Sequence, residues 1–280
     1  WTNGAIERLG RQPVLVASVA ILAFFTLLAL AAPLVAGDPA TLNPIQRLKP
    51  PSVANWLGTD QVGRSVLARV IWGTQVSLLV GAAVAVSTTV IGVAIGVLAG
   101  YFRAADAVIM RVMDALMAIP AILLAIALVA LIGASPFVLV TAISLPEIPR
   151  MARMVRGSVL VLREQAYVEA AITCGGRLHS ILLRHILPGA AGPILVQATY
   201  VFASAMILEA ILLFLGAGTP PDVPSWGNMM SEGRQFLQIA PWILGFPALC
   251  LSLVVLAVNL LGDGLRDMLD PSLARMGGTP

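Results

Sequence analysis

The sequence of 280 residues has little charge, two histidines and two cysteines, and each shortage excludes a class of protein. Asp, Glu, Lys and Arg make up 11% of the chain and apolar residues 59%, and the mean hydropathy is +0.93. That is too little charge to cover the surface of a soluble domain of this length. The composition therefore predicts an integral membrane protein.

The scarce reactive residues also argue against the common catalytic sites. His179 and His185 lie six residues apart and form no His-Glu-x-x-His frame, so we expect no metal site. The single lysine, Lys49, follows no glycine-rich phosphate loop, so we do not expect this chain to bind ATP itself. Cys174 lies in a polar segment and Cys250 in an apolar run, which argues against a disulfide. We expect no catalytic residues and no cofactor held by this chain.

Two further functions are disfavoured by where the charges lie. The arginines are scattered over several loops instead of gathering with aromatic residues on one face, so nucleic-acid binding is not expected. Asp114 and Asp263, the best pair for an intramembrane aspartyl protease, lie near helix ends in different surroundings.

Long apolar runs predict an all-α polytopic membrane protein with six transmembrane helices. A bilayer core about 30 Å thick needs about 20 helical residues. Five runs reach that length, and a sixth spans only if its helix continues through Pro146 and Pro149, which neighbouring helices can make tolerable. After a cytoplasmic N-terminal segment, 1–13, a transmembrane domain covers 14–280, with predicted spans 14–35, 76–100, 112–133, 137–155, 190–215 and 242–262.

The basic residues predict the orientation of these spans. With the N-terminus in the cytoplasm, twelve of the seventeen Lys and Arg residues lie on the cytoplasmic side, as the positive-inside rule requires. Both termini are then cytoplasmic. The connecting segments are outer loops 36–75 and 216–241, a cytoplasmic loop 156–189 and a cytoplasmic tail 263–280. We take the first run as a retained helix and not a signal peptide, because its apolar core is long.

Few ionisable residues are expected inside the membrane. Glu209 is the one deep acid, and two explanations stay open for it: a polar wall of a solute path, or a helix-packing hydrogen bond. Asp114 and Glu147 are expected near the inner ends of their spans, paired with arginines such as Arg111 or Arg150. In the first outer loop, Asp60 is a predicted cap of an amphipathic helix over 60–72, within a lid packed on its own spans.

The cytoplasmic loop is the most informative segment. Residues 167–174 predict a short helix, Gly175 and Gly176 a break, and residues 177–186 a second helix that Pro188 stops. Before the loop, arginines at a spacing of three predict a basic helix face, for which a lipid-surface anchor is the plainer explanation (Arg150, Arg153, Arg156).

This loop resembles the signature cytoplasmic loop of ABC importer permeases, which reads Glu-Ala-Ala, three residues, Gly and later Leu-Pro. The matching residues are Glu169, Ala170, Ala171, Gly175, Leu187 and Pro188. Residues 57–60, 63–65, 214–221, 224–229 and 259–271 are similar to the C-type subunits of dipeptide, oligopeptide and nickel permeases. The chain departs from that pattern at Ser65, where aspartate is usual, and in 145–149, where an aromatic is common.

The resemblance implies a type I ABC importer permease fold in the bacterial inner membrane and ATP-driven, binding-protein-dependent import of di- or oligopeptides. The implied partners are a homologous permease, two ATPase subunits that bind ATP and Mg²⁺, and an extracytoplasmic solute-binding protein. Within the loop, Gly175 would supply the turn, Glu169 and Arg184 polar contacts to an ATPase, and Leu178, Ile181 and Leu182 an apolar seat. The alternatives are an importer permease for nickel chelates, glutathione or opines, and, in a different class, a self-sufficient secondary carrier.

Overall fold

The computed structural model describes residues 13–218 and 223–269, which form helices joined by loops. Strands are absent from these residues apart from one bridge between Thr59 and Ser65. The elements are α2 (Pro13–Val35), η1 (Pro44–Gln46), α3 (Val66–Tyr101), α4 (Arg103–Met117), α5 (Ala121–Ile132), α6 (Pro136–Leu162), α7 (Ala166–Thr173), α8 (Leu178–Ile181), η2 (Leu182–Ile186), α9 (Leu187–Phe214), α10 (Trp226–Gly233), η3 (Arg234–Phe236) and α11 (Trp242–Leu269). The predicted all-α class is confirmed, while the N-terminal segment before Pro13 and the tail beyond Leu269 lie outside the described residues.

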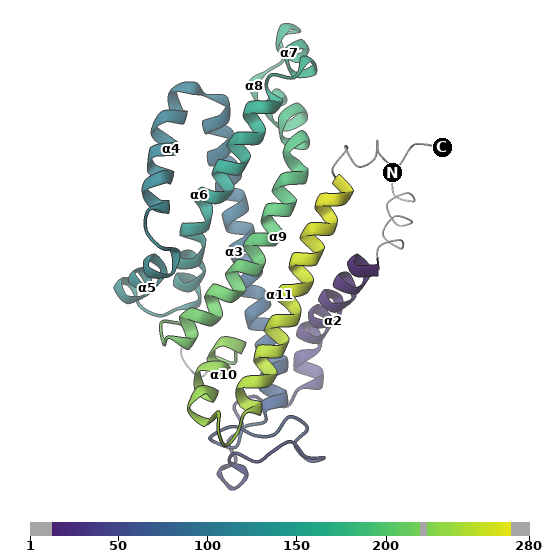
Figure 1. The fold of residues 1–280 in the computed structure, drawn as a ribbon, viewed down its shortest axis with the longest axis vertical. Helices are drawn as coiled ribbons and strands as arrows, with labels where there is room; N and C mark the ends of the chain where they lie inside the picture. The colour runs from purple at the N-terminus through teal and green to yellow at the C-terminus, as the bar shows by residue number, and fades with distance from the viewer. Residues whose placement is uncertain (1–12, 219–222, 270–280) are drawn as a thin grey trace.

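The long helices run side by side and separate two ends of the molecule. Helices α7 and α8 lie at one end, and α10 lies with the loop before α3 at the other (Figure 1). The predicted cytoplasmic loop and the predicted outer loops are therefore at opposite ends of the bundle.

Within the described residues, four helices are long and apolar enough to cross a membrane, or five if α4 and α5 count as one bent crossing. The predicted span over 137–155 falls on α6, which continues without interruption through Pro146 and Pro149, as the sequence predicted. This helix also carries Glu147 and three arginines, so by length and composition alone it is not a candidate membrane span. Its place as the sixth span stays a prediction.

The predicted span over 112–133 is not one continuous helix. The structure divides this run into α4 and α5, which are bent by 85° relative to each other. The break falls at Pro120, which cannot donate a backbone hydrogen bond and disfavours helical geometry at Ile119 before it. With 12 residues, α5 is about 18 Å long, too short to cross a bilayer core by itself.

The start of the second long helix also differs from the prediction. Helix α3 begins at Val66 instead of residue 76, so the first outer loop ends at Ser65. The N-cap is Ser65, whose side chain accepts from the backbone N–H of Ala68, and not Asp60. Because serine and aspartate are both strong N-cap residues, Ser65 preserves the helix start at a position where the resembled family has aspartate.

Helices α3 and α6 pack closely along a seam of glycines spaced by four residues. A Cβ atom at Gly92, Gly96 or Gly100 would lie 2.6 to 2.7 Å from atoms of α6. At Gly96 the obstructing atoms include the backbone carbonyl oxygen of Ala152, which cannot rotate away. Small residues at this spacing let membrane helices approach each other closely.

We expect Gly96→Ala to lower the thermal unfolding midpoint of the purified protein. The added methyl group forces α3 and α6 apart, and such overpacking destabilises by about 1–3 kcal/mol. Gly157→Ala on α6 is the matched control, because its Cβ would meet no atom within 4 Å. That variant should be neutral or slightly stabilised, since alanine favours a helix over glycine by about 1 kcal/mol. Equal unfolding midpoints for the two variants would contradict the close packing of α3 against α6 at Gly96.

Candidate functional site

The predicted helix-break-helix is present at residues 166–186, which we call the helix-break-helix segment. Helix α7 ends at Thr173, and Gly175 has φ +77°, a left-handed conformation that glycine adopts without strain. The N–H of Gly176 donates to the Ala171 carbonyl at 3.0 Å, which closes the end of α7. Helix α8 then begins at Leu178.

Pro188 does not stop the second helix as predicted. One apolar helix continues from Leu178 to Phe214, and a π-helical turn, η2, precedes α9. Proline cannot donate to the carbonyl of Arg184 four residues earlier, and its ring crowds that carbonyl. A single π turn widens the helix at this point, so the chain passes Pro188 without breaking.

The helix-break-helix segment is held against the long helices by its own apolar residues. Val168, Ile181 and Ile186 are at most 3% exposed and belong to the same buried cluster as residues of α6 and α9. Leu182 is partly buried against this cluster. Of the predicted apolar seat, only Leu178 is exposed, at 41%, so the other two leave little apolar surface for a partner.

The outward side of the segment combines apolar and basic residues. The sequence analysis did not include Leu183, which is 62% exposed, or Ile172 and Tyr167, both 47% exposed. A cavity of about 340 Å³ lies beside α8 and is lined by Arg177, His179, Ser180, Leu183 and Arg184. Glu169 and Ala170 are exposed on α7, and Ala171 is half-buried. An acidic or mixed partner surface would complement this side.

The arginines of α6 form ion pairs and not a free basic face. Arg153 donates to Asp114 at 2.6 Å and Arg156 to Asp106, so both tie α6 to α4. Glu147 pairs with Arg150 at 3.0 Å, as predicted, whereas Asp114 pairs across helices and not with Arg111 on its own helix. The half of α6 that leads into the helix-break-helix segment is therefore held to α4 by ion pairs.

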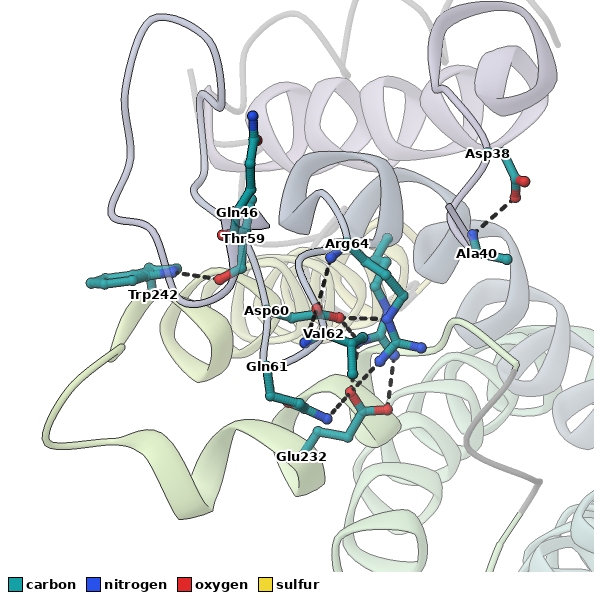
Figure 2. A network of polar contacts seen from close by, with 11 residues as sticks. Asp38, Ala40, Gln46, Thr59, Asp60, Gln61, Val62, Arg64, Glu232 and Trp242 are labelled. Atoms are coloured by element: carbon teal, nitrogen blue, oxygen red, sulfur yellow. Dashed lines mark hydrogen bonds and ion pairs between the residues drawn. The ribbon is translucent and has the colours of Figure 1, made fainter. Parts of the chain in front are cut away.

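A second polar site lies at the opposite end, where the first outer loop meets α3 and α10. Asp60, Arg69 and Glu232 come from three separate elements and converge there together with Arg64. Figure 2 shows Asp60, Arg64 and Glu232 close together. Arg69 donates to Asp60 at 2.9 Å and to Glu232 at 2.7 Å. Arg69 and Asp60 are at most 1% exposed, so this is a buried ion network.

A tight turn in the outer loop directs Asp60 into the network. Its Oδ1 accepts from the backbone N–H groups of Val62 and Arg64 at 3.0 and 2.8 Å. Gly63 has φ +81°, and a Cβ there would lie 1.8 Å from the Asn43 carbonyl oxygen, so only glycine fits. The sequence analysis assigned Asp60 to a helix cap and missed the network, although an arginine in the first turn of an apolar helix was a signal for a buried partner.

Glu209 is 1% exposed and belongs to the packing between α9 and α3. Ser77 of α3 lies 3.4 Å from its Oε1, and the backbone N–H of Trp226 donates to the same serine at 3.4 Å. This contact fits the helix-packing explanation, although Oε2 of Glu209 has no hydrogen-bond donor among the described residues, so both explanations stay open. Within residues 13–218 and 223–269, no three His, Cys, Asp or Glu side chains are grouped to hold a metal ion.

Comparisons with known proteins agree with this arrangement. Residues 89–275 match the family described as binding-protein-dependent transport system inner membrane component, and residues 1–51 match the N-terminal TM domain of oligopeptide transport permease C. A probable peptide ABC transporter permease protein of Sinorhizobium fredii is 51% identical, over 98% of this chain and 94% of its own. A dipeptide transport system permease protein of Alkalihalophilus pseudofirmus is 41% identical, over 96% of this chain and 89% of its own.

Two further similarities extend the comparison. A glutathione transport system permease protein of Pectobacterium atrosepticum is 46% identical, over 80% of this chain and 74% of its own. The solved structure of the MetNI methionine ABC transporter in an inward-facing conformation has the same fold, with a TM-score of 0.56 and 19% identity over 73% of this chain and 96% of that chain. The chain therefore belongs to the binding-protein-dependent transport system inner membrane components, as a C-type, multi-pass permease subunit that functions with a second permease, ATPase subunits and a binding protein.

Proposed function

We propose that this permease imports di- or oligopeptides through a path shared with one homologous permease, and that two ATPase subunits drive it. Support comes from relatives named as peptide and dipeptide permeases over nearly the whole chain. The observation that carries the mechanism is the helix-break-helix segment, which is anchored through Val168, Ile181 and Ile186 and presents an exposed side. The proposed orientation has this segment and both termini in the cytoplasm.

The residues in and around the proposed ATPase contact have different roles. Gly175 supplies the left-handed turn between α7 and α8, and Glu169 and Arg184 offer exposed charges of opposite sign. Leu178 supplies the apolar contact, while Ile181 and Leu182 hold the segment to its own helices. The ATPase subunits, and not this chain, bind ATP and Mg²⁺. Their closure would move α6 and α9 as rigid bodies.

Reconstitution tests this function. The complex, purified through a tag on this chain, should contain a second permease and two ATPase subunits. In proteoliposomes it should take up a labelled dipeptide only when ATP and the solute-binding protein are both present. Dipeptide uptake without ATPase subunits would instead indicate a secondary carrier.

Glutathione import is the second candidate, because one relative at 46% identity is named a glutathione permease. Competition distinguishes the two solutes in the same proteoliposomes. Excess unlabelled dipeptide should suppress uptake of labelled dipeptide, and excess glutathione should leave it unchanged. ATP-driven uptake of labelled glutathione, with no uptake of labelled dipeptide, would assign the second candidate.

We expect Leu178→Asp to separate this chain from the ATPase subunits. The substitution places a charge in the proposed apolar contact, where a buried, unpaired charge costs several kcal/mol. The readout is the amount of ATPase subunit that co-purifies with the tagged chain. Leu42→Asp is the matched control, because Leu42 is 63% exposed in the outer loop at the opposite end. Full retention of the ATPase by Leu178→Asp would contradict the proposed contact.

A further inference from the structure

A cavity of about 250 Å³ lies among α6, α9 and α11, beside the first residue of α5. Its polar lining comes from Glu147 and Arg150 of α6, Tyr200 and Ser204 of α9, and Asn259 of α11. Glu147 is about 16 Å along the 27-residue helix α6, close to its middle. An ionisable residue inside a membrane-spanning helix is costly to insert and is by default a candidate for a functional site.

Glu147, which lines this cavity, also has an unused acceptor. Its Oε1 accepts from Arg150 Nη1 at 3.0 Å and from Ser204 Oγ at 3.2 Å. Its Oε2 is buried and finds no hydrogen-bond donor among the described residues. Leaving a charged, buried oxygen without a donor is expensive, so the site is suited to a donor that a ligand brings.

Arg150 supplies the opposite charge beside this acceptor. Its side chain lines the cavity and is 43% exposed, whereas that of Glu147 is 1% exposed, so Arg150 is the more accessible of the two. A guanidinium has five N–H donors, and Glu147 uses one of those of Arg150. The remaining donors suit a carboxylate, which arginine binds through two parallel hydrogen bonds.

We propose that this cavity binds the two charged ends of a zwitterionic solute, with Glu147 accepting from the ammonium group and Arg150 donating to the carboxylate. The inference rests on the proposed function, because a short peptide carries both groups. The volume is slightly below the roughly 300–1,000 Å³ of ordinary ligand pockets, and the proposal assigns the rest of the wall to the second permease. Glu209, which is also buried, does not line this cavity.

The test uses a reporter thiol in the assembled complex. Ile207 lines the cavity and is 42% exposed, so Ile207→Cys places a thiol there, with Cys174→Ser and Cys250→Ala removing the native thiols. The rates of modification by 2-aminoethyl methanethiosulfonate, a cation, and 2-sulfonatoethyl methanethiosulfonate, an anion, are measured. The ratio of the two rates reports the charge of the cavity.

Glu147→Gln should lower this cation-to-anion ratio about tenfold, and Arg150→Gln should raise it, because one unit charge a few ångströms away changes the local ion concentration by that order. Asp114→Asn is the matched control, since it neutralises a carboxylate that is paired with α6 but does not line the cavity. It should leave the ratio within about twofold, as expected of a distant, exposed charge.

Ligand chemistry is read from protection of the same thiol. A millimolar zwitterionic dipeptide should slow modification in the complex that retains Glu147, and the Glu147→Gln variant should lose this protection. The N-acetylated dipeptide amide has neither charged end, so it should not protect the thiol in either complex. An unchanged ratio in Glu147→Gln, or equal protection by the two peptides, would overturn the proposal. Failure of the proposed function is read separately, as absence of ATP-driven dipeptide uptake by the wild-type complex.

Discussion

Replacing Gly175 with tryptophan should abolish ATP-driven dipeptide uptake, whereas Gly175→Ala should retain most of it. Both variants place a side chain at φ +77°, which costs about 1–2 kcal/mol for any ordinary L residue. A Cβ at this position would meet no atom of the chain within 4 Å. Gly175 is also exposed, so we expect the indole to point away from the isolated permease and to clash only with a partner seated on the helix-break-helix segment.

Uptake and assembly must be measured together for this comparison. Membrane insertion and heterodimer formation should be normal in both variants, and binding-protein-stimulated ATP hydrolysis should be lost only in Gly175→Trp. Gly175→Asn adds a control for backbone strain, because asparagine tolerates the left-handed region. Unchanged uptake by an assembled Gly175→Trp complex would show that no partner occupies this space.

Replacing Arg69 with methionine should destabilise the protein by about 3–5 kcal/mol, the range for breaking a buried ion pair from one side. The substitution roughly preserves length but leaves Asp60 and Glu232 facing each other with Arg64 as their remaining cation. Glu232 is on α10 and Asp60 in the outer loop, so we expect these elements to separate. Thermal unfolding in detergent and protease cleavage of the outer loop measure the two effects.

Arg47→Met is the matched control for this prediction. Arg47 lies in the same outer loop and is exposed. An exposed arginine contributes roughly 0–1 kcal/mol through ion pairs, so the midpoint should hardly move. Equal midpoints for Arg69→Met and Arg47→Met would mean that the buried network does not hold the loop.

The sequence predicted the helical class and the helix-break-helix segment because both depend on local features. Apolar runs and the pair Gly175-Gly176 act through hydrophobic length and backbone freedom, which neighbours along the chain determine. The single long helix through Pro146 and Pro149 was predicted for a different reason, because neighbouring membrane helices can satisfy the backbone groups that proline frees. Family motifs identified the segment before its geometry was known.

Other features depend on contacts that periodicity does not encode. Asp60 is a plausible N-cap by sequence, yet Arg69 and Glu232, far apart in the chain, take it into a buried network. The burial of Ile181 depends on packing against α6 and α9. An amphipathic pattern does not show whether the apolar face of a helix packs on the protein's own core or on a partner subunit. The 85° bend after α4 follows from Pro120, whose effect was hidden inside a continuous apolar run.

The chain connects the two proposed sites directly. The helix-break-helix segment lies between α6 and α9, and these helices carry Glu147 and Ser204 of the cavity. The Ser204 hydroxyl donates to Glu147 at 3.2 Å, so the pair joins the two helices at the cavity wall. We expect movement of the segment to change the separation of α6 and α9 and hence access to Glu147, since packed helices move as rigid bodies.

Cross-linking from the native thiol of Cys174 tests the central claim most directly. Cys174 is exposed at the end of α7, and Cys250→Ala leaves it as the single target for a thiol-reactive benzophenone. Illumination of the assembled complex should yield an adduct of this chain with an ATPase subunit. In the control, Leu42→Cys provides the thiol in the outer loop and Cys174→Ser removes the native one. This variant should yield no such adduct. Cross-linking of Cys174 to the solute-binding protein, or to lipid alone, would contradict the assignment of the helix-break-helix segment as the ATPase contact.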